Sequence, residues 1–166
     1  MKLTTRGHYS VKALLDLSLQ PAGSRSSVRA IATRQQLPAP YLEKLLIELR
    51  RAEIVHSVRG AHGGYYLAKP PSQISLSQIL EAVGESVHQT ANSMLEPAMR
   101  PAMGSETGSE MGSAQPPLAE DWVTAVLWQR LSQKLKEALS SITLEDLYYD
   151  ARSWQAAQGE DTSFVV

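Results

Sequence analysis

The side chain with the clearest chemistry in this sequence is Arg59, which opens the glycine-rich segment 59–65. A guanidinium is permanently charged, donates to phosphate oxygens, and is attracted into narrow minor grooves, where the negative potential of DNA is concentrated. Gly60, Gly63 and Gly64 permit backbone turns that larger side chains would obstruct. The pattern therefore predicts an arginine presented on a tight turn for contact with nucleic acid. The alternative is a surface Arg59 that pairs with Glu53.

Two kinds of element would position this arginine. Apolar residues 54–58 and 65–67 predict two short strands, so that segment 54–68 forms a hairpin. Upstream, residues 41–51 predict an amphipathic helix with a buried stripe at i, i+3, i+4, i+7 spacing. The stripe consists of Leu42, Leu45, Leu46 and Leu49, and the opposite face carries Lys44, Ile47, Glu48 and Arg51. A helix followed by such a hairpin is the winged-helix arrangement, whose usual target is duplex DNA.

Further helices are expected around this unit. Residues 6–20 predict a helix with Val11, Leu14, Leu15 and Leu19 near one face, and residues 29–36 predict a shorter helix. Residues 37–40 predict a turn, with Pro40 as the first residue of the next helix. Residues 75–83 predict a helix capped by a serine. The expected fold class is mainly α with a small β-hairpin wing.

The second half of the chain begins with a change of composition. Residues 86–117 are rich in Pro, Gly, Ser and Met and predict a flexible loop. Five residues at heptad spacing then predict a long helix that packs along another helix. They are Trp128, Leu131, Leu135, Ala138 and Ile142. Residues 143–146 resemble a capping box and predict a short last helix.

These elements predict a division of the chain into four parts. Residues 1–85 are expected to form a winged-helix DNA-binding domain, and residues 86–117 the flexible loop. Residues 118–154 are expected to form the dimerisation helices, and residues 155–166 a loose tail.

Charge is distributed unevenly along the chain. Residues 1–70 carry eleven lysines and arginines against four acidic residues, a net charge of +7, whereas residues 71–166 carry five against thirteen, a net charge of −8. A basic half predicts a surface for a polyanion, and the alternative is ordinary surface charge that happens to be segregated. The sequence has no signal peptide and no apolar segment as long as a membrane span, so a cytoplasmic protein without membrane contact is expected.

Candidate DNA contacts form two groups. Contacts to phosphates, which supply most of the affinity, are expected from exposed cations and hydroxyls. These are Lys2, Thr4, Arg6, Arg29, Arg34, Arg50, Arg51, Ser57 and Lys69. Base contacts are expected from Glu43, accepting from cytosine, and Lys44, donating to guanine, in the first turn of helix 41–51. Tyr41 could meet a phosphate or a thymine methyl group. The alternative for Glu43 is a favourable interaction with the helix dipole.

Several of these pieces occur together in one known family. The matching segments are residues 1–7 with Tyr9, residues 41–43, residues 58–65, and residues 127–144. Together they resemble the Rrf-two family of bacterial winged-helix transcriptional regulators, which includes IscR. The resemblance implies a winged helix-turn-helix plus a long dimerisation helix. It also implies a homodimer, with the five heptad residues in its interface, that binds a palindromic operator in double-stranded DNA.

The same resemblance shows where this chain departs from the family. Sensing members hold an iron–sulfur cluster through three cysteines and a further ligand in the loop before the long helix. This sequence contains no cysteine, which excludes disulfides, thiol catalysis and a cysteine-ligated cluster within these residues. No metal site and no cofactor are therefore expected. The signal is left open between a small-molecule effector, a protein effector and no signal.

The leading interpretation is a sequence-specific DNA-binding transcriptional regulator. The alternative is a protein-interaction regulator built on the same fold that has lost DNA binding. An enzyme is not expected, because the sequence has no metal-ligand cluster, phosphate-binding loop or nucleophile motif, and no catalytic residue is assigned. Two patterns have two interpretations each. The loop methionines near His88 either bind Cu(I) or are loosely placed apolar side chains. Trp122 and Trp128 either form interface core or line a ligand pocket.

Overall fold

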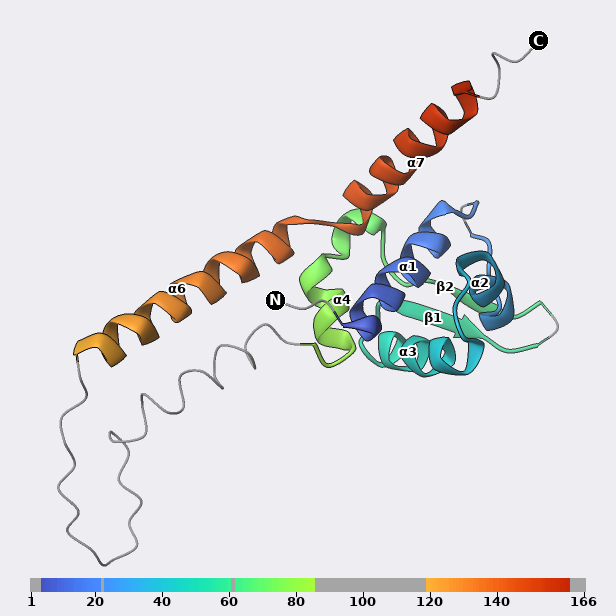
Figure 1. The fold of residues 1–166 in the computed structure, drawn as a ribbon. Coiled ribbons are helices and arrows are strands. Elements are labelled where there is room, and N and C mark those ends of the chain that lie inside the picture. The colour runs from blue at the N-terminus through green and yellow to red at the C-terminus, as the bar shows by residue number, and fades with distance from the viewer. Residues whose placement is uncertain (1–3, 22, 61, 86–118, 162–166) are drawn as a thin grey trace, which may run out of the picture. The chain divides into compact units, whose positions relative to one another are not determined.

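The computed structural model describes residues 4–21, 23–60, 62–85 and 119–161. The predicted flexible loop, its methionines, His88 and Lys2 lie outside these residues. Figure 1 shows the described elements as helices and one hairpin. They are α1 (Thr5–Leu19), α2 (Val28–Gln35), α3 (Ala39–Arg51), β1 (Val55–Val58), β2 (Gly64–Leu67), the 3-10 turn η1 (Pro71–Gln73), α4 (Leu76–Ala82), α6 (Ala119–Ser141) and α7 (Leu144–Asp161). The predicted fold class is confirmed.

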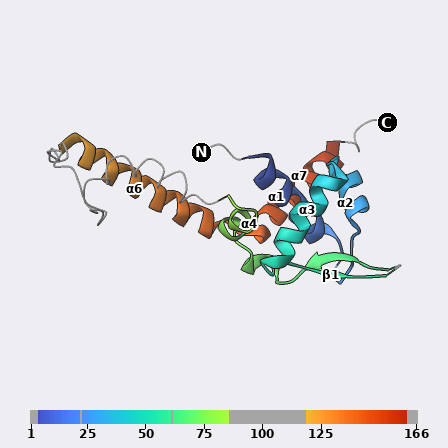
Figure 2. The same ribbon diagram turned by 90° about the horizontal axis from the view of Figure 1, so that it is seen from below.

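The hairpin directly follows α3 and packs beside it (Figures 1 and 2). β1 and β2 are antiparallel, with Val55 opposite Leu67 and Val58 opposite Gly64. Val55 is fully buried and Leu67 packs against the core, so one face of the hairpin closes the hydrophobic interior. His56 and Tyr66 alternate with these residues and lie on the opposite face. α2 and α3 are the two helices of the helix-turn-helix, and together with the hairpin they belong to one packed body.

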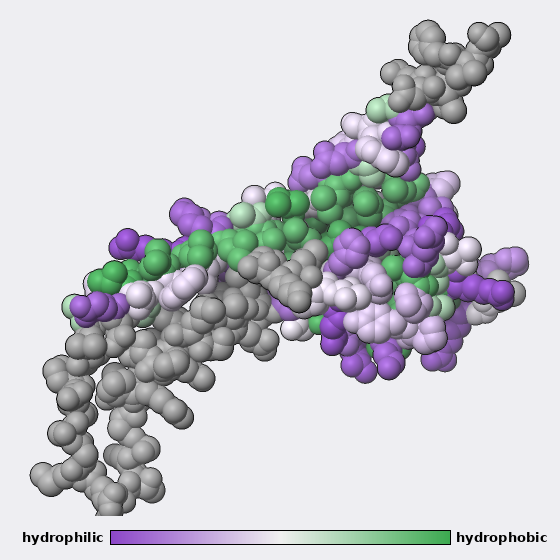
Figure 3. Space-filling view, in the orientation of Figure 1, coloured by the Kyte–Doolittle hydropathy of each residue, from purple (hydrophilic) through white to green (hydrophobic). Residues whose placement is uncertain are grey.

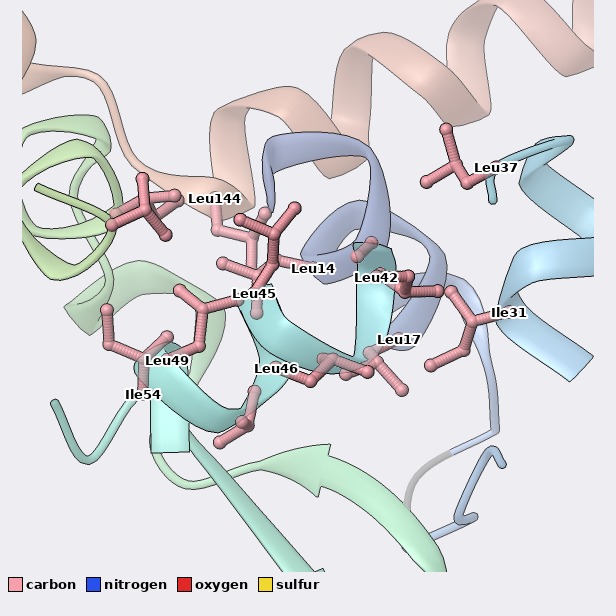
Figure 4. Packing of buried hydrophobic residues seen from close by; sticks show 14 of the residues in the cluster. Leu14, Leu17, Ile31, Leu37, Leu42, Leu45, Leu46, Leu49, Ile54 and Leu144 are labelled. Atoms are coloured by element: carbon pink, nitrogen blue, oxygen red, sulfur yellow. The ribbon is translucent and has the colours of Figure 1, made fainter. Parts of the chain in front are cut away.

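The buried stripe predicted on α3 is confirmed. Leu42, Leu45, Leu46 and Leu49 are all buried. Figure 4 shows them gathered with Leu14 and Leu17 of α1, Ile31 of α2, and Leu144 at the start of α7. Burying side chains of this size contributes about 1.5–3 kcal/mol each, which makes α3 the centre of the domain's stability. The outer face of α3 is thereby held rigidly toward solvent.

The buried face predicted for α1 is partly wrong. Leu14 is buried as expected, but Val11, Leu15 and Leu19 are only partly buried, while Ala13 and Leu17 are buried. The reason is that α1 contacts α2, α3, α4, β2 and α7, so no single stripe describes its packing. A helix covered on several sides does not show the simple amphipathic period from which the prediction was made.

The predicted caps on two later helices are confirmed. Ser75 and Gln78 form a capping box at α4, and Thr143 with Asp146 forms the equivalent arrangement at α7. The hydrogen bonds of Asp146 to the backbone and hydroxyl of Thr143 lower the pKa of its carboxyl group. α7 is longer than the predicted short helix and runs past residue 154 to Asp161. Residues 155–158 are Gln and Ala, which favour helix continuation.

The described residues belong to two compact units. One contains residues 4–85 together with the chain from Leu139 onward, and the other contains α6 up to Ala138. Backbone pairing joins the distant segments of the first unit, because Leu144 donates to Ile74 and Leu76 donates to Ile142. No helix in the described ranges has the length and apolar character needed to cross a membrane.

Candidate nucleic-acid interface

The outer face of α3 presents Glu43 and Lys44 to solvent. The helix begins at Ala39, so both residues lie in its second turn rather than in the first turn as predicted. The first turn holds no acidic residue. Because the helix dipole acts mainly within the terminal turn, the second-turn position of Glu43 favours the base-contact interpretation over the dipole interpretation. Lys44 is free of hydrogen bonds and ion pairs to the residues the structure describes.

Replacing Glu43 by alanine is expected to relax base preference at one operator position. A carboxylate that accepts from the amino group of cytosine discriminates against other bases by about 1–3 kcal/mol. Selection of bound duplexes from a random library by the Glu43→Ala and wild-type proteins would measure this change. The Lys44→Ala protein provides the comparison, because it should alter a different position. An unchanged consensus for Glu43→Ala would remove this residue from the base-reading group.

The loop between β1 and β2 presents Arg59. Its side chain is exposed, and within the described part of the chain it forms neither the alternative pair with Glu53 nor another ion pair or hydrogen bond. Gly63 is required by close packing, because a Cβ there would lie 2.3 Å from the carbonyl oxygen of Val58. Gly60 has a φ of +111°, which side chains disfavour. The glycines therefore shape the turn that carries the arginine.

Three predicted phosphate contacts, Arg6, Arg50 and Ser57, are engaged in bonds between elements. Arg6 forms an ion pair with Glu48 of α3, which raises the pKa of the Arg6 guanidinium. Ser57 accepts a hydrogen bond from Arg50 at 3.1 Å. The Arg6 side chain is 44 % exposed, so its remaining donors still face solvent. These bonds join α1 to α3 and α3 to β1.

Arg34 has an internal partner that the sequence analysis did not predict. Its Nε and Nη2 atoms donate to the two carboxylate oxygens of Asp16 at 2.9 and 2.6 Å, and Nη2 also donates to Ser26 at 2.8 Å. Gln35 donates to the same carboxylate at 3.0 Å. The ion pair raises the pKa of Arg34. A charged residue among the leucines of α1 was the available signal, since a buried carboxylate requires a partner.

The other predicted contacts remain at the surface. Thr4, Arg29 and Arg51 are exposed. Tyr41 is partly buried, with its ring edge-on to Tyr9 at 5.9 Å between ring centres. Gly64 opens β2 opposite Val58.

Two residues near this surface were missed by the sequence analysis. Arg25 stands 6.0 Å from the ring centre of Tyr66 on the exposed face of the hairpin, within range of a cation–π interaction. Glu85 accepts from the Gly7 amide at 2.8 Å. It therefore caps α1, where the side chain of Thr4 makes no capping bond. Neither contact has a local sequence signal.

α6 carries exposed apolar side chains. Trp122 is 66 % exposed and Leu131 is 54 % exposed. Val123, Leu127 and Trp128 are also exposed, and Figure 3 shows the apolar band along the helix. Of the predicted heptad residues, Leu135 is partly buried, whereas Trp128, Leu131, Ala138 and Ile142 are exposed. Exposed apolar bands of this kind mark contact surfaces in soluble proteins.

A helix-turn-helix joined to a hairpin with an exposed arginine defines the winged-helix class of DNA-binding proteins. The chain belongs to the Rrf2 family, because a family model described as an iron-dependent transcriptional regulator matches residues 3–150. It is thus an HTH-type transcriptional regulator, and the predicted family is confirmed.

Relatives and solved structures agree with this assignment. A Synechocystis protein named "Putative HTH-type transcriptional regulator slr0846" is 58 % identical over 166 residues, covering all of both chains. IscR of Cereibacter sphaeroides is 48 % identical over 90 residues, covering 53 % of this chain and 58 % of IscR. The T. potens IscR structure has a TM-score of 0.65 and 32 % identity, covering 93 % of this chain and 91 % of that chain. The structure of CymR, described as the global cysteine regulator of B. subtilis, also has a TM-score of 0.65, with 28 % identity and coverage of 90 % and 97 %.

Proposed function

We propose that this chain regulates transcription as a cytoplasmic homodimer that binds a palindromic operator, without a cysteine-ligated cluster. The observation that carries the proposal is the exposure of two cations, Lys44 on α3 and Arg59 on the hairpin. Both belong to the domain whose apolar core is buried. Two cations without internal partners suit two neighbouring contacts on a duplex, one in the major groove and one in the minor groove.

The exposed band on α6 supports the homodimer. Trp128, Leu131 and Leu135 follow heptad spacing, which is the pattern of helices that pack along each other. A second copy of the chain presents the same band, so one symmetric contact removes both bands from water. Two winged helices in one dimer then require an operator with two related half-sites. The division of the chain predicted from the sequence is retained as part of this proposal, except that α7 extends through residues 155–161, which were predicted to belong to a loose tail.

The absence of cysteine from the 166 residues supports regulation without a thiolate-bound cluster. Iron–sulfur clusters in proteins are held chiefly by cysteine thiolates, so the donor set of this chain does not fit one. The description of the family as iron-dependent is therefore not carried over to this chain. The effector stays open between a small molecule, a protein partner and none.

The experiment that tests the proposed function is selection of bound duplexes from a random-sequence library. The proposal expects enrichment of a two-fold symmetric sequence, called the selected duplex below. The alternative, a protein-interaction regulator that has lost DNA binding, expects no enrichment over the unselected library. Mass measurement of the complex with the selected duplex should show an even number of protomers.

Arg59→Ala is expected to weaken binding to the selected duplex by about tenfold, because a desolvated arginine contact in the groove contributes about 1–2 kcal/mol. The dimer should be unaffected, since Arg59 lies on the hairpin and has no partner among the described residues. Fluorescence titration and sedimentation would measure the two properties separately. Equal affinity of the variant and the wild type would contradict this role for the wing.

A further inference from the structure

The carboxylate of Asp16 on α1 is at the centre of a polar network with the end of α2. Its side chain is 3 % exposed, and it accepts two bonds from Arg34 and one from Gln35. The donors are the guanidinium of Arg34 and the side-chain amide of Gln35, both in the last turn of α2. This network therefore fixes the position of α2 against α1 through a charge that has almost no access to water.

Arg34 extends the network to the hairpin. Its Nη2 atom donates to the hydroxyl of Ser26, which is itself buried. The backbone of Ser26 pairs with Tyr65 of β2 through two hydrogen bonds of 3.0 and 2.8 Å. A Cβ on Gly64 would lie 2.8 Å from the Ser26 carbonyl, so the two backbones are in close contact here. A continuous set of bonds thus runs from α1 through α2 to the strand that follows the Arg59 loop.

Arg34 and Arg29 lie on the same helix but have different surroundings. Arg29 is exposed, and within the described residues its side chain has no hydrogen bond or ion pair. The Arg34 side chain is 38 % exposed, so a phosphate could approach it. Turning Arg34 toward a phosphate would nevertheless leave the Asp16 carboxylate buried with only Gln35 as a partner, which is strongly unfavourable.

We propose that Arg34 is a positioning residue for DNA binding, which sets the wing relative to the helix-turn-helix through Asp16 and Ser26 and does not itself contact phosphate. The proposal rests on the proposed function, because it assumes that the wing contacts DNA. It assigns Arg29 to phosphate and Arg34 to the internal network. The roles of these two arginines cannot be told apart from their charge or from their positions on α2, so the internal contacts of Arg34 decide between them.

The test exploits the difference between a guanidinium and an ammonium group. Lysine retains the charge that a phosphate contact needs but lacks the planar fork that binds Asp16 and Ser26 together. Arg34→Lys is therefore expected to weaken binding to the selected duplex at least about fivefold. In the Arg34→Lys protein, the further loss of affinity caused by Arg59→Ala, called its cost, should fall from about tenfold to less than about twofold. If Arg34 contacts phosphate instead, Arg34→Lys binds like wild type and the Arg59→Ala cost is unchanged.

Ser26→Ala serves as the second variant, because it removes the hydroxyl that Arg34 binds while leaving the Asp16–Arg34 pair and the backbone bonds between Ser26 and Tyr65 in place. In the Ser26→Ala protein too, Arg59→Ala should weaken DNA binding less than it does in the wild-type protein. Arg29→Lys is the comparison variant and should leave the full Arg59→Ala cost, because within the described residues the Arg29 side chain has no bond to Asp16 or to the wing. Equal Arg59→Ala costs in the Ser26→Ala and wild-type proteins would overturn the proposal.

Hydrogen exchange separates failure of this inference from failure of the proposed function. If the wild-type chain enriches no duplex, the proposed function fails. The internal network is still tested in that case, because the Tyr65 amide should exchange at least about tenfold faster in Ser26→Ala and Arg34→Lys than in wild type. Unchanged Tyr65 exchange in both variants would overturn the role of Arg34 in holding the wing.

Discussion

Replacing Arg34 by alanine is expected to destabilise the folded protein by about 3–5 kcal/mol, because it leaves the buried carboxylate of Asp16 without its ionic partner. That carboxylate is 3 % exposed and cannot recover the lost interaction from water. Urea unfolding at one fixed protein concentration would measure the change, since the proposed dimerisation would make stability depend on concentration. Arg29→Ala on the same helix is the control and should stay within about 0.5 kcal/mol of wild type.

The reciprocal change should cost less. Asp16→Ala leaves Arg34, whose side chain is 38 % exposed and can turn toward water. A loss of about 2 kcal/mol is expected from the hydrogen bonds to the carboxylate. The double variant should be more stable than Arg34→Ala alone, because it no longer contains an isolated buried charge. If the destabilisations of the two single variants add up to that of the double variant, the pair does not hold the domain together. The same conclusion follows if Arg34→Ala is as stable as wild type.

Replacing Leu131 by aspartate is expected to dissociate the homodimer and lower affinity for the selected duplex by about 100-fold or more, because linked half-site binding is lost. The Leu131 side chain is 54 % exposed in the protomer, so a charge there should leave the protomer folded. In the proposed interface the same charge would be buried without a partner, which is costly. Sedimentation would measure the dimer, and titration of the selected duplex would measure the binding.

Gln129→Asp is the matched control for this variant. Residue 129 lies two positions before Leu131 and therefore on the opposite side of α6, and it is exposed. It introduces the same charge on the side of α6 that faces away from Leu131 and the other heptad residues, so both the dimer and DNA affinity should be retained. Of the exposed apolar residues of α6, Trp122 shares that side. A Leu131→Asp protein that still sediments as a dimer would place the interface elsewhere. Loss of the dimer with undiminished affinity would contradict the coupling of dimerisation to operator binding.

Much of the winged helix could be predicted from local patterns. The leucine stripe on α3 has the period of a helix with one buried face, and the structure buries all four leucines. The strands on either side of the Arg59 loop follow from short apolar segments joined by glycines. The caps at Ser75 and Thr143 follow from side chains that bond to the backbone within one turn. Each of these features is encoded within a few neighbouring residues.

Features that depend on distant contacts could not be predicted. The burial of α1 depends on several elements that cover it, and the expected single face was therefore partly wrong. The Asp16–Arg34 pair joins residues 18 positions apart, and the cap from Glu85 to Gly7 joins residues 78 positions apart. No local period indicates such partners. The continuation of α7 past residue 154 was missed because a polar composition was taken as a sign of a loose tail.

The salt dependence of binding to the selected duplex tests the central claim most directly. Neutralising about three to four phosphates per protomer predicts a slope of about −5 to −7 for the logarithm of the association constant against the logarithm of salt concentration. A slope in this range, made shallower by Arg29→Ala and unchanged by Gln129→Asp, is the predicted result. A flat titration, with no preference for the selected duplex over a scrambled one, would contradict the account.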